Sequence, residues 1–297
     1  MALGAQATAP SGTVQLTDIF DPVYINRVVR DVASEPIIGQ SLVEVINLTG
    51  SEVSSYTYQS SIWEEMTGAA PVAENDAAPE DALETDNVQI DGDRVALSTF
   101  VLDKVEKAIV PAGNKALERL TKAVRRYFHE QILELFTSLT NSQGSNTVEN
   151  DLANWDLVTH NFLIQNHDDG DLWVCFANDA WRDLRADLVA NAAALFGAAF
   201  GDRAQQALQS RTVGQGVPWD GFTAYRSGDN PAGDTTGWTS ALGVRGPNAA
   251  IEFPVWQDLK AEMQRDATRF GTWIVVSMIG EPGIIKNDNA RAFITRT

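Results

Sequence analysis

The sequence predicts a mixed α+β chain that carries a long protruding β-hairpin followed by a long amphipathic helix. Residues 51 to 103 alternate polar and apolar side chains around an acidic centre, as the two arms of a hairpin would. Residues 113 to 140 place apolar side chains three and four positions apart, which is the spacing of a half-buried helix. The segments after residue 152 change repeatedly between strand-like and helix-like patterns, which predicts a compact α/β unit over residues 153 to 254.

The two sides of the hairpin have the two-residue period of half-buried strands. On the outgoing side, the even positions carry the apolar side chains of Tyr56, Tyr58, Ile62 and Met66. On the returning side, Val88 and Ile90 occupy even positions, whereas the apolar residues between 95 and 101 occupy odd ones. The phase therefore changes at residues 91 to 93, where we expect a bulge or a tight turn.

The predicted hairpin is too long to lie within a compact domain. About fourteen residues of strand at about 3.3 Å each reach about 45 Å, against a radius of gyration of about 19 Å for a compact chain of this length. The tip, residues 68 to 86, is rich in Ala, Pro and carboxylates and has no apolar period. A lone two-stranded hairpin is marginally stable in water, so its apolar stripe needs a surface to cover it. We therefore predict oligomerisation through this hairpin.

The predicted helix over residues 113 to 140 is about 40 Å long and has a single apolar stripe, formed by Leu117, Leu120, Val124, Phe128, Leu135 and Leu139. Beside the stripe lies a basic row at spacings of three and four, made of Lys115, Arg119, Lys122 and Arg126, with Arg125 nearby. This row is either a solvated face or a contact surface. Residues 64 to 93 carry ten Asp and Glu and no Lys or Arg, which favours contact between the hairpin of one subunit and the helix of another. The candidate contact residues are Tyr56, Tyr58, Ile62, Glu74, Asp76, Glu80, Arg119, Lys122 and Arg126.

Shorter elements are predicted on both sides of this pair. Asp21 can cap a helix with Pro22 at its first position, and Pro36 ends that helix. Residues 41 to 50 predict a strand, and residues 152 to 165 have a short apolar period. The run LWVCF predicts a buried strand before a helix that Asn178 can cap, and GFTAYRS predicts another strand. Residues 227 to 248 have the composition of an exposed, turn-rich stretch, and residues 266 to 297 predict a long strand and a second strand that turns back.

The composition argues against several classes of protein. No apolar run approaches the roughly 18 residues of a membrane span, and the N-terminus lacks the features of a secretory signal, so we expect a cytoplasmic product without a membrane partner. The single cysteine, Cys175, rules out an internal disulfide and a cysteine-based zinc cage, and we expect a buried, inert thiol. A net charge of −18 argues against tight, specific binding of nucleic acid but allows nucleic acid to be enclosed.

The sequence contains no motif for catalysis, a cofactor or a metal. The three histidines, His129, His160 and His167, lack the spacing of a helical zinc site, and the acidic run after His167 lacks the ligand pattern of a calcium loop. There is no nucleophile elbow, phosphate loop or dinucleotide fingerprint. Eight Trp spread along the chain suit packing better than a ligand-binding surface. We expect no enzymatic activity; a soluble α+β enzyme whose site assembles from scattered carboxylates is the alternative.

In this order, the parts of the chain resemble the HK97-fold major capsid proteins of tailed bacteriophages. The resemblance rests on LTDIFDP and a short helix, the acidic hairpin, the long helix, the α/β unit ending near VPWDGFTAYRS, and the strand pair in RDATRFGTWIVVSMIGEPGIIKNDNARAFI. It covers nearly the whole chain. It implies an N-terminal arm over residues 1 to 51, an extended loop over 52 to 103, a peripheral domain with a spine helix over 104 to 152, an axial domain over 153 to 254, and closing strands of the peripheral domain over 255 to 297.

The function implied by this resemblance is that of a capsid protein. Hexamers and pentamers of the chain would form an icosahedral shell around phage double-stranded DNA, assembled in the host cytoplasm and retained in the virion. The implied partners are the chain itself and separate scaffold, portal and decoration proteins, with the DNA enclosed without sequence-specific binding. An encapsulin, a cellular shell of the same fold that encloses cargo protein, is the alternative.

Two features depart from known members of the family. The chain starts at Met1 without room for the large cleaved scaffold region of some members, so we expect any scaffold to be a separate protein. Some members crosslink through a lysine in the extended loop, but there is no Lys between Ser51 and Asp103. We therefore expect no crosslink of that kind.

Overall fold

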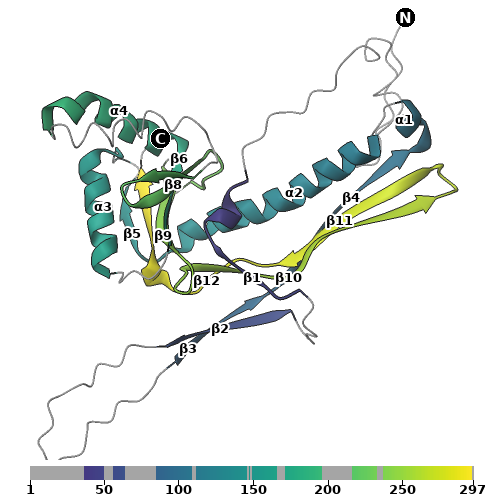
Figure 1. Ribbon diagram of the computed structural model, residues 1–297, viewed down its shortest axis with the longest axis horizontal. Helices are drawn as coiled ribbons and strands as arrows, with labels where there is room; N and C mark the ends of the chain where they lie inside the picture. The colour runs from purple at the N-terminus through teal and green to yellow at the C-terminus, as the bar shows by residue number, and fades with distance from the viewer. Residues whose placement is uncertain are drawn as a thin grey trace, which may run out of the picture.

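The computed structural model describes residues 37–49, 56–63, 85–108, 112–145, 147, 149–165, 171–195, 216–232 and 237–295. This part of the chain forms two larger sheets with helices packed on them, and a two-stranded hairpin that extends from the first sheet (Figure 1). The helix expected after Asp21 and the hairpin tip lie outside the described residues.

The first sheet has five strands in the order β1-β10-β11-β4, with β12 paired to β10. The strands are β1 (Glu44–Asn47), β4 (Asp93–Leu102), β10 (Ile251–Asp266), β11 (Gly271–Gly280) and β12 (Gly283–Ile284). Strand β4 pairs antiparallel with β11 from Asp93 opposite Gly280 to Leu102 opposite Gly271. The long strand expected after Asp266 is confirmed as β11. The sequence did not predict its partner β10, although Leu259, Ala261 and Met263 alternate with polar residues in the second half of that strand; most of the residues from Asp258 on are exposed.

Helix α2 (Ala112–Glu134) lies along β4 and β11, with the short helix α1 (Asp103–Ala108) before it (Figure 1). Leu120, Val124 and Phe128 of its apolar stripe are buried, and the Phe128 ring packs on Phe253 of β10 at 5.3 Å between centroids. The predicted helix begins where expected. It ends at Glu134 rather than at residue 140, because the chain continues as a 3₁₀ turn, η3 (Leu135–Ser138), and becomes extended at Leu139.

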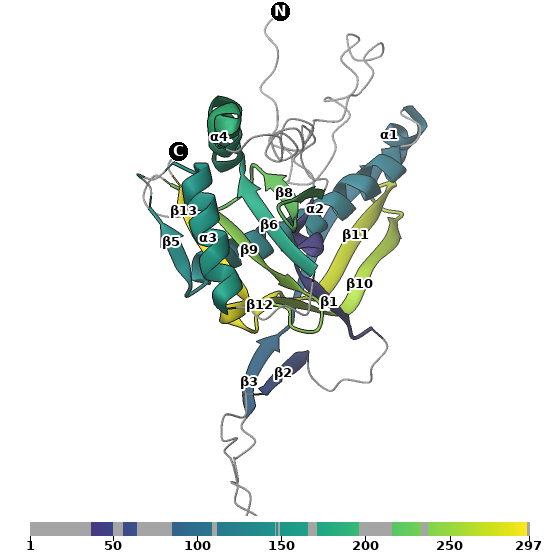
Figure 2. The ribbon, with the colours of Figure 1, turned by 60° about the vertical axis from the view of Figure 1, so that its left-hand side comes forward.

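The second sheet has six strands in the order β5-β13-β9-β6-β8-β7. They are β5 (Ser142–Gly144), β6 (Asp171–Ala177), β7 (Val217–Trp219), β8 (Phe222–Ser227), β9 (Trp238–Arg245) and β13 (Ala290–Thr295). Helices α3 (Leu152–Gln165) and α4 (Asn178–Leu195) pack on one face (Figure 2). The start of α4 at Asn178 agrees with the position predicted from the sequence.

The C-terminal segment corrects one expectation. The resemblance to capsid proteins implied that residues 255 to 297 complete the domain of the long helix, but β13 lies between β5 and β9 in the other sheet. A second correction is β9, a mostly buried strand within the stretch expected to be exposed turns. Alternation identifies a strand but not its partner, and here the partner is set by the two cores on which Ala292 and Phe293 pack.

The apolar run of β6 follows from burial on both faces. Trp173 and Cys175 point to the core shared with α2, whereas Val174 and Phe176 point to the core beneath α3 and α4. Trp173 stacks on Phe136 of η3 at 5.8 Å with an interplanar angle of 24°. One continuous core therefore joins the two sheets.

The Cys175 thiol gives a test of this core. It is 0% exposed, and burial raises its pKa to about 12. Because the thiolate is the reactive species, we expect a thiol reagent near neutral pH to label the native protein at least a hundredfold more slowly than the unfolded protein. Ser98→Cys, on the exposed part of β4, is the control and should label quickly. Rapid loss of the native thiol would contradict the arrangement of the core.

Candidate inter-subunit surface

Strands β2 (Thr57–Trp63) and β3 (Thr85–Asp91) form the hairpin. They pair antiparallel from Thr57 opposite Asp91 to Trp63 opposite Thr85, without a third strand among the described residues. Figures 1 and 2 show the hairpin leaving the first sheet on the side away from α2. The chain passes from β3 to β4 at Gly92 and thereby changes sheets, which confirms the change of phase predicted at residues 91 to 93.

The root of the hairpin is closely packed at Gly92. A Cβ atom at this position would lie 2.5 Å from Cε3 of Trp256 and closer still to another atom of that ring. The Gly92 N–H donates a hydrogen bond of 2.6 Å to the carbonyl oxygen of Tyr56. The Tyr56 ring meets Trp256 edge-on, with centroids 6.3 Å apart. Glycine is therefore required because the indole of β10 lies directly against the backbone.

Two further contacts attach the hairpin to the first sheet. Burial raises the pKa of Tyr58, and a hydrogen bond to Glu252 of β10 and the charge of that carboxylate raise it further. Ile90 is 6% exposed, and its Cδ1 atom lies 2.6 Å from where a Cβ atom of Gly283 would be. These contacts set the direction in which the hairpin leaves the body.

The structure divides the predicted apolar contact residues. Tyr56 and Tyr58 lie at the root and contact β10 of their own chain, although half of Tyr56 is exposed. Ile62, near the outer end of β2, is half-buried. The part of the hairpin that a partner could cover therefore begins beyond Tyr58, towards its outer end. Glu74, Asp76 and Glu80 lie outside the described residues.

The basic residues on α2 that were predicted to contact another subunit have different environments. Arg119 and Lys122 are exposed. Arg126 instead binds within its own chain, with Nη2 2.6 Å from Asp229 Oδ1 and Nε 3.0 Å from Glu130 Oε1. Spacing on a helix shows which residues share a face, but it does not show where the fold brings a carboxylate to that face. Asp229, which follows β8, was not foreseeable from the helix alone.

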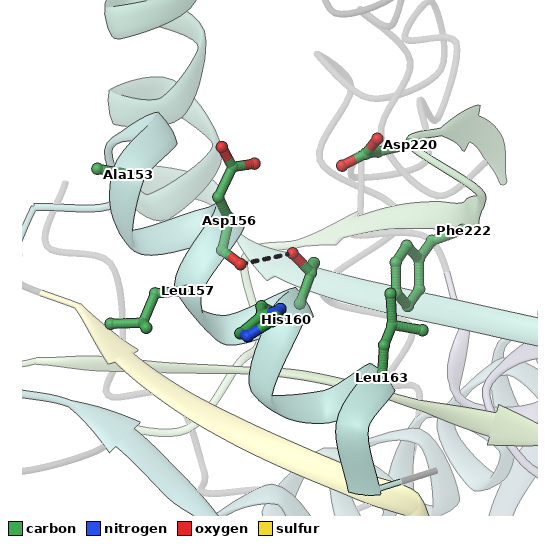
Figure 3. A pocket seen from close by; sticks show the side chains of 8 residues that line it. Ala153, Asp156, Leu157, His160, Leu163, Asp220 and Phe222 are labelled. Atoms are coloured by element: carbon green, nitrogen blue, oxygen red, sulfur yellow. Dashed lines mark hydrogen bonds between the residues drawn. The ribbon is translucent and has the colours of Figure 1, made fainter. Parts of the chain in front are cut away.

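A shallow groove lies between α3 and the turn that joins β7 to β8 (Figure 3). Its lining includes the side chains of Asp156, His160 and Asp220. The Thr159 hydroxyl donates to the carbonyl oxygens of Trp155 and Asp156, at 2.9 and 3.1 Å, so it is held by the helix backbone. Asp220 accepts a hydrogen bond of 3.0 Å from the Trp155 indole, which fixes the turn. These contacts are structural, and they give the groove no activated nucleophile.

The described residues show neither a metal-binding cluster nor a membrane-spanning helix. They contain no group of three or more His, Cys, Asp or Glu that could hold a metal ion. None of the helices in this part of the chain is long and apolar enough to cross a membrane.

The packing at Gly92 gives a second test. Gly92→Ala should destabilise the chain by about 1 to 3 kcal/mol, because the added methyl group overlaps the Trp256 ring. In a Trp256→Leu background, whose side chain is smaller, the same change should cost much less. Chemical denaturation of all four proteins measures this coupling. Equal costs in the two backgrounds would show that Trp256 does not crowd Gly92.

Comparison with solved structures identifies the fold. The sequence matches no model of a known protein family and no curated protein. The structure is similar to the capsid of cyanophage P-SCSP1u, with a TM-score of 0.66 and 16% identity over 93% of this chain and 94% of that one. It is similar to the capsid of an empty GTA particle, with a TM-score of 0.66 and 11% identity over 91% and 93% of the two chains. It is also similar to the capsid of Myoviridae phage XM1, with a TM-score of 0.62 and 11% identity over 96% of this chain and 100% of that one. The chain therefore has the HK97-like fold of phage major capsid proteins.

Proposed function

We propose that the chain is a major capsid protein whose copies form hexamers and pentamers and close into an icosahedral shell around phage double-stranded DNA. The observation that carries this proposal is the match of nearly the entire chain to phage capsids. On this reading the hairpin is the extended loop, α2 is the spine helix, and the six-stranded sheet with α3 and α4 is the axial domain. The protein acts in the virion as a structural component and not as an enzyme.

The hairpin supports this proposal physically. Two strands without a third are marginal on their own, so the part beyond the root needs a partner surface to become stable. The contacts of Gly92, Tyr58 and Ile90 hold the root in one direction. A directed projection that binds a different surface of the next copy makes a head-to-tail contact, and such contacts close into rings when the rotation fits.

The charge of the chain suits a container for DNA. At −18 the protein offers no net attraction to phosphate, so the enclosed DNA is retained by the closed shell. The same charge keeps the free subunit soluble at the high concentrations that assembly requires. Scaffold, portal and decoration proteins are the further partners that this function implies.

We also propose which surfaces meet. The acidic segment of residues 64 to 93, which includes Glu74, Asp76 and Glu80, approaches the α2 face of a neighbouring copy near Arg119 and Lys122. Arg126 does not take part, since Asp229 and Glu130 already bind it. Ile62 and the outer part of β2 supply the apolar portion of the contact.

Assembly is the first test of the function. We expect the purified chain, alone or with its scaffold protein, to form closed particles that electron microscopy resolves into hexamers and pentamers. Particles isolated from infected cells should contain double-stranded DNA, whereas an encapsulin would contain cargo protein. A chain that stays monomeric under every assembly condition, with or without its phage partners, would contradict the proposal.

The proposed charge contact has its own test. Each exposed ion pair contributes about 0 to 1 kcal/mol, but a shell repeats the contact in every subunit. The double variant Arg119→Glu with Lys122→Glu should therefore lower particle yield severalfold. Adding Glu74→Lys, Asp76→Lys and Glu80→Lys should restore part of it.

A matched double variant serves as the control. Arg182→Glu with Lys260→Glu reverses two exposed cations on α4 and β10. Any loss that it causes should not be rescued by the three lysine substitutions. If these substitutions rescue both double variants equally, or neither, the segment does not contact the α2 face.

A further inference from the structure

His129 lies buried where three separate segments of the chain meet. It is on α2, is 1% exposed, and is covered by the turn η2 (Gly39–Ser41), which comes just before β1. Its Nδ1 atom accepts a hydrogen bond of 3.0 Å from the Gly39 N–H. Its Nε2 atom lies 3.5 Å from Oδ2 of Asp229, in the loop after β8.

These contacts fix the protonation state of the ring. A nitrogen that accepts a hydrogen bond carries no proton, so the imidazole is neutral and its one proton is on Nε2, which makes no hydrogen bond within the described residues although Asp229 Oδ2 lies 3.5 Å away. A second proton would have to reside on Nδ1. The Nδ1–H and the Gly39 N–H would then point at each other, so two hydrogen-bond donors would meet without an acceptor.

The turn cannot adjust to such a proton while it stays docked. A Cβ atom on Gly39 would lie 3.0 Å from the Cα atom of His129 and 3.1 Å from Cδ1 of Ile132, so the backbone already lies directly against α2. On both sides of Gly39, Ile38 and Leu42 are 2% and 0% exposed in the shared core. Moving Gly39 away from Nδ1 therefore requires the turn to leave the helix.

Three charged groups act on the ring. Burial is the largest influence and lowers the pKa of His129 below its ordinary value of 6.5. Asp229 and Glu130 favour the charged form, and Arg126, which binds both carboxylates, opposes it. Residues 37 to 43 bring no titratable side chain.

The sign of the effect follows from the lowered pKa. The folded state binds the proton less readily than the unfolded state, so the stabilisation is complete above a pH of about 6.5. It is lost as the pH falls from there towards the folded pKa.

We propose that His129 is an acid-sensitive latch for the N-terminal part of the chain: protonation of its ring breaks the bond to Gly39 and releases residues 37 to 43 from α2. Strand β1, which pairs with β10, stays attached and is then the first element of the described residues that does. This inference concerns the folded subunit and does not depend on shell assembly.

Hydrogen–deuterium exchange of the full-length chain tests the latch. Protection factors, corrected for intrinsic exchange, are measured for the amides of residues 39 to 43 at about pH 8 and about pH 5. We expect these factors to fall about tenfold or more in acid, as the loss of a buried hydrogen bond predicts, while the amides of α2 keep theirs.

Two substitutions separate the latch from a general effect of acid. In His129→Asn, the amide oxygen takes the place of Nδ1 as an acceptor but does not titrate, so the pH response should disappear. His160→Asn, on the exposed face of α3, should respond as the wild type does. A wild-type chain whose protection does not change with pH, or a His129→Asn chain that responds equally, would overturn the proposal.

A third variant gives a readout that a purely structural role would not produce. Asp229→Asn removes a negative charge that favours the protonated ring, so the midpoint of the opening should move to lower pH. This measurement also decides the matter if His129→Asn fails to fold. A midpoint that stays the same or rises would contradict the latch.

Discussion

Helix α2 packs against the first sheet and the turn η3 that continues it packs against the second, and the positions of the other elements follow from these contacts. Phe128 packs on Phe253 of the first sheet, and the turn that continues the helix stacks Phe136 on Trp173 of the second. Because these rings belong to one continuous core, the two sheets cannot move independently without exposing it. The proposed role in a shell requires this rigidity, since small changes in the angle between the parts of a subunit would change the curvature of the assembly.

The same requirement explains the difference between the root and the outer part of the hairpin. At the root, Trp256, Glu252 and Gly283 hold the chain in one direction through close contacts. Beyond Tyr58 the hairpin has only its own two strands among the described residues, and their stability has to come from another surface. The root thus fixes where the hairpin points, and the outer strands are the part that the proposed contact with a neighbouring copy would cover.

The sequence predicted the elements that depend on local periodicity. The α2 stripe, the β6 run and the change of phase at Gly92 are confirmed, since each is set by which side of a short segment is buried. Features that depend on distant partners were not predictable. Nothing near Arg126 indicates that Asp229 binds it, and nothing in β13 shows that it pairs with β9. Strand β10 was not predicted either: Leu259, Ala261 and Met263 share one face of its second half, but most residues of that half are exposed rather than packed in a core.

The pairing of Arg126 with Asp229 changes how the basic surface of α2 should be interpreted. The basic row on α2 looks uniform in the sequence, but its members differ in the structure. Arg126 binds Asp229 in the loop after β8, whereas Arg119 and Lys122 are exposed. Asp229 also lies beside His129, which in turn accepts the hydrogen bond from Gly39. Asp229 therefore both binds Arg126 of α2 and lies beside the His129 ring, and that ring in turn holds residues 37 to 43 through Gly39. Substituting Arg126 would disturb these internal contacts together, so its loss could not be attributed to a contact with another copy of the chain.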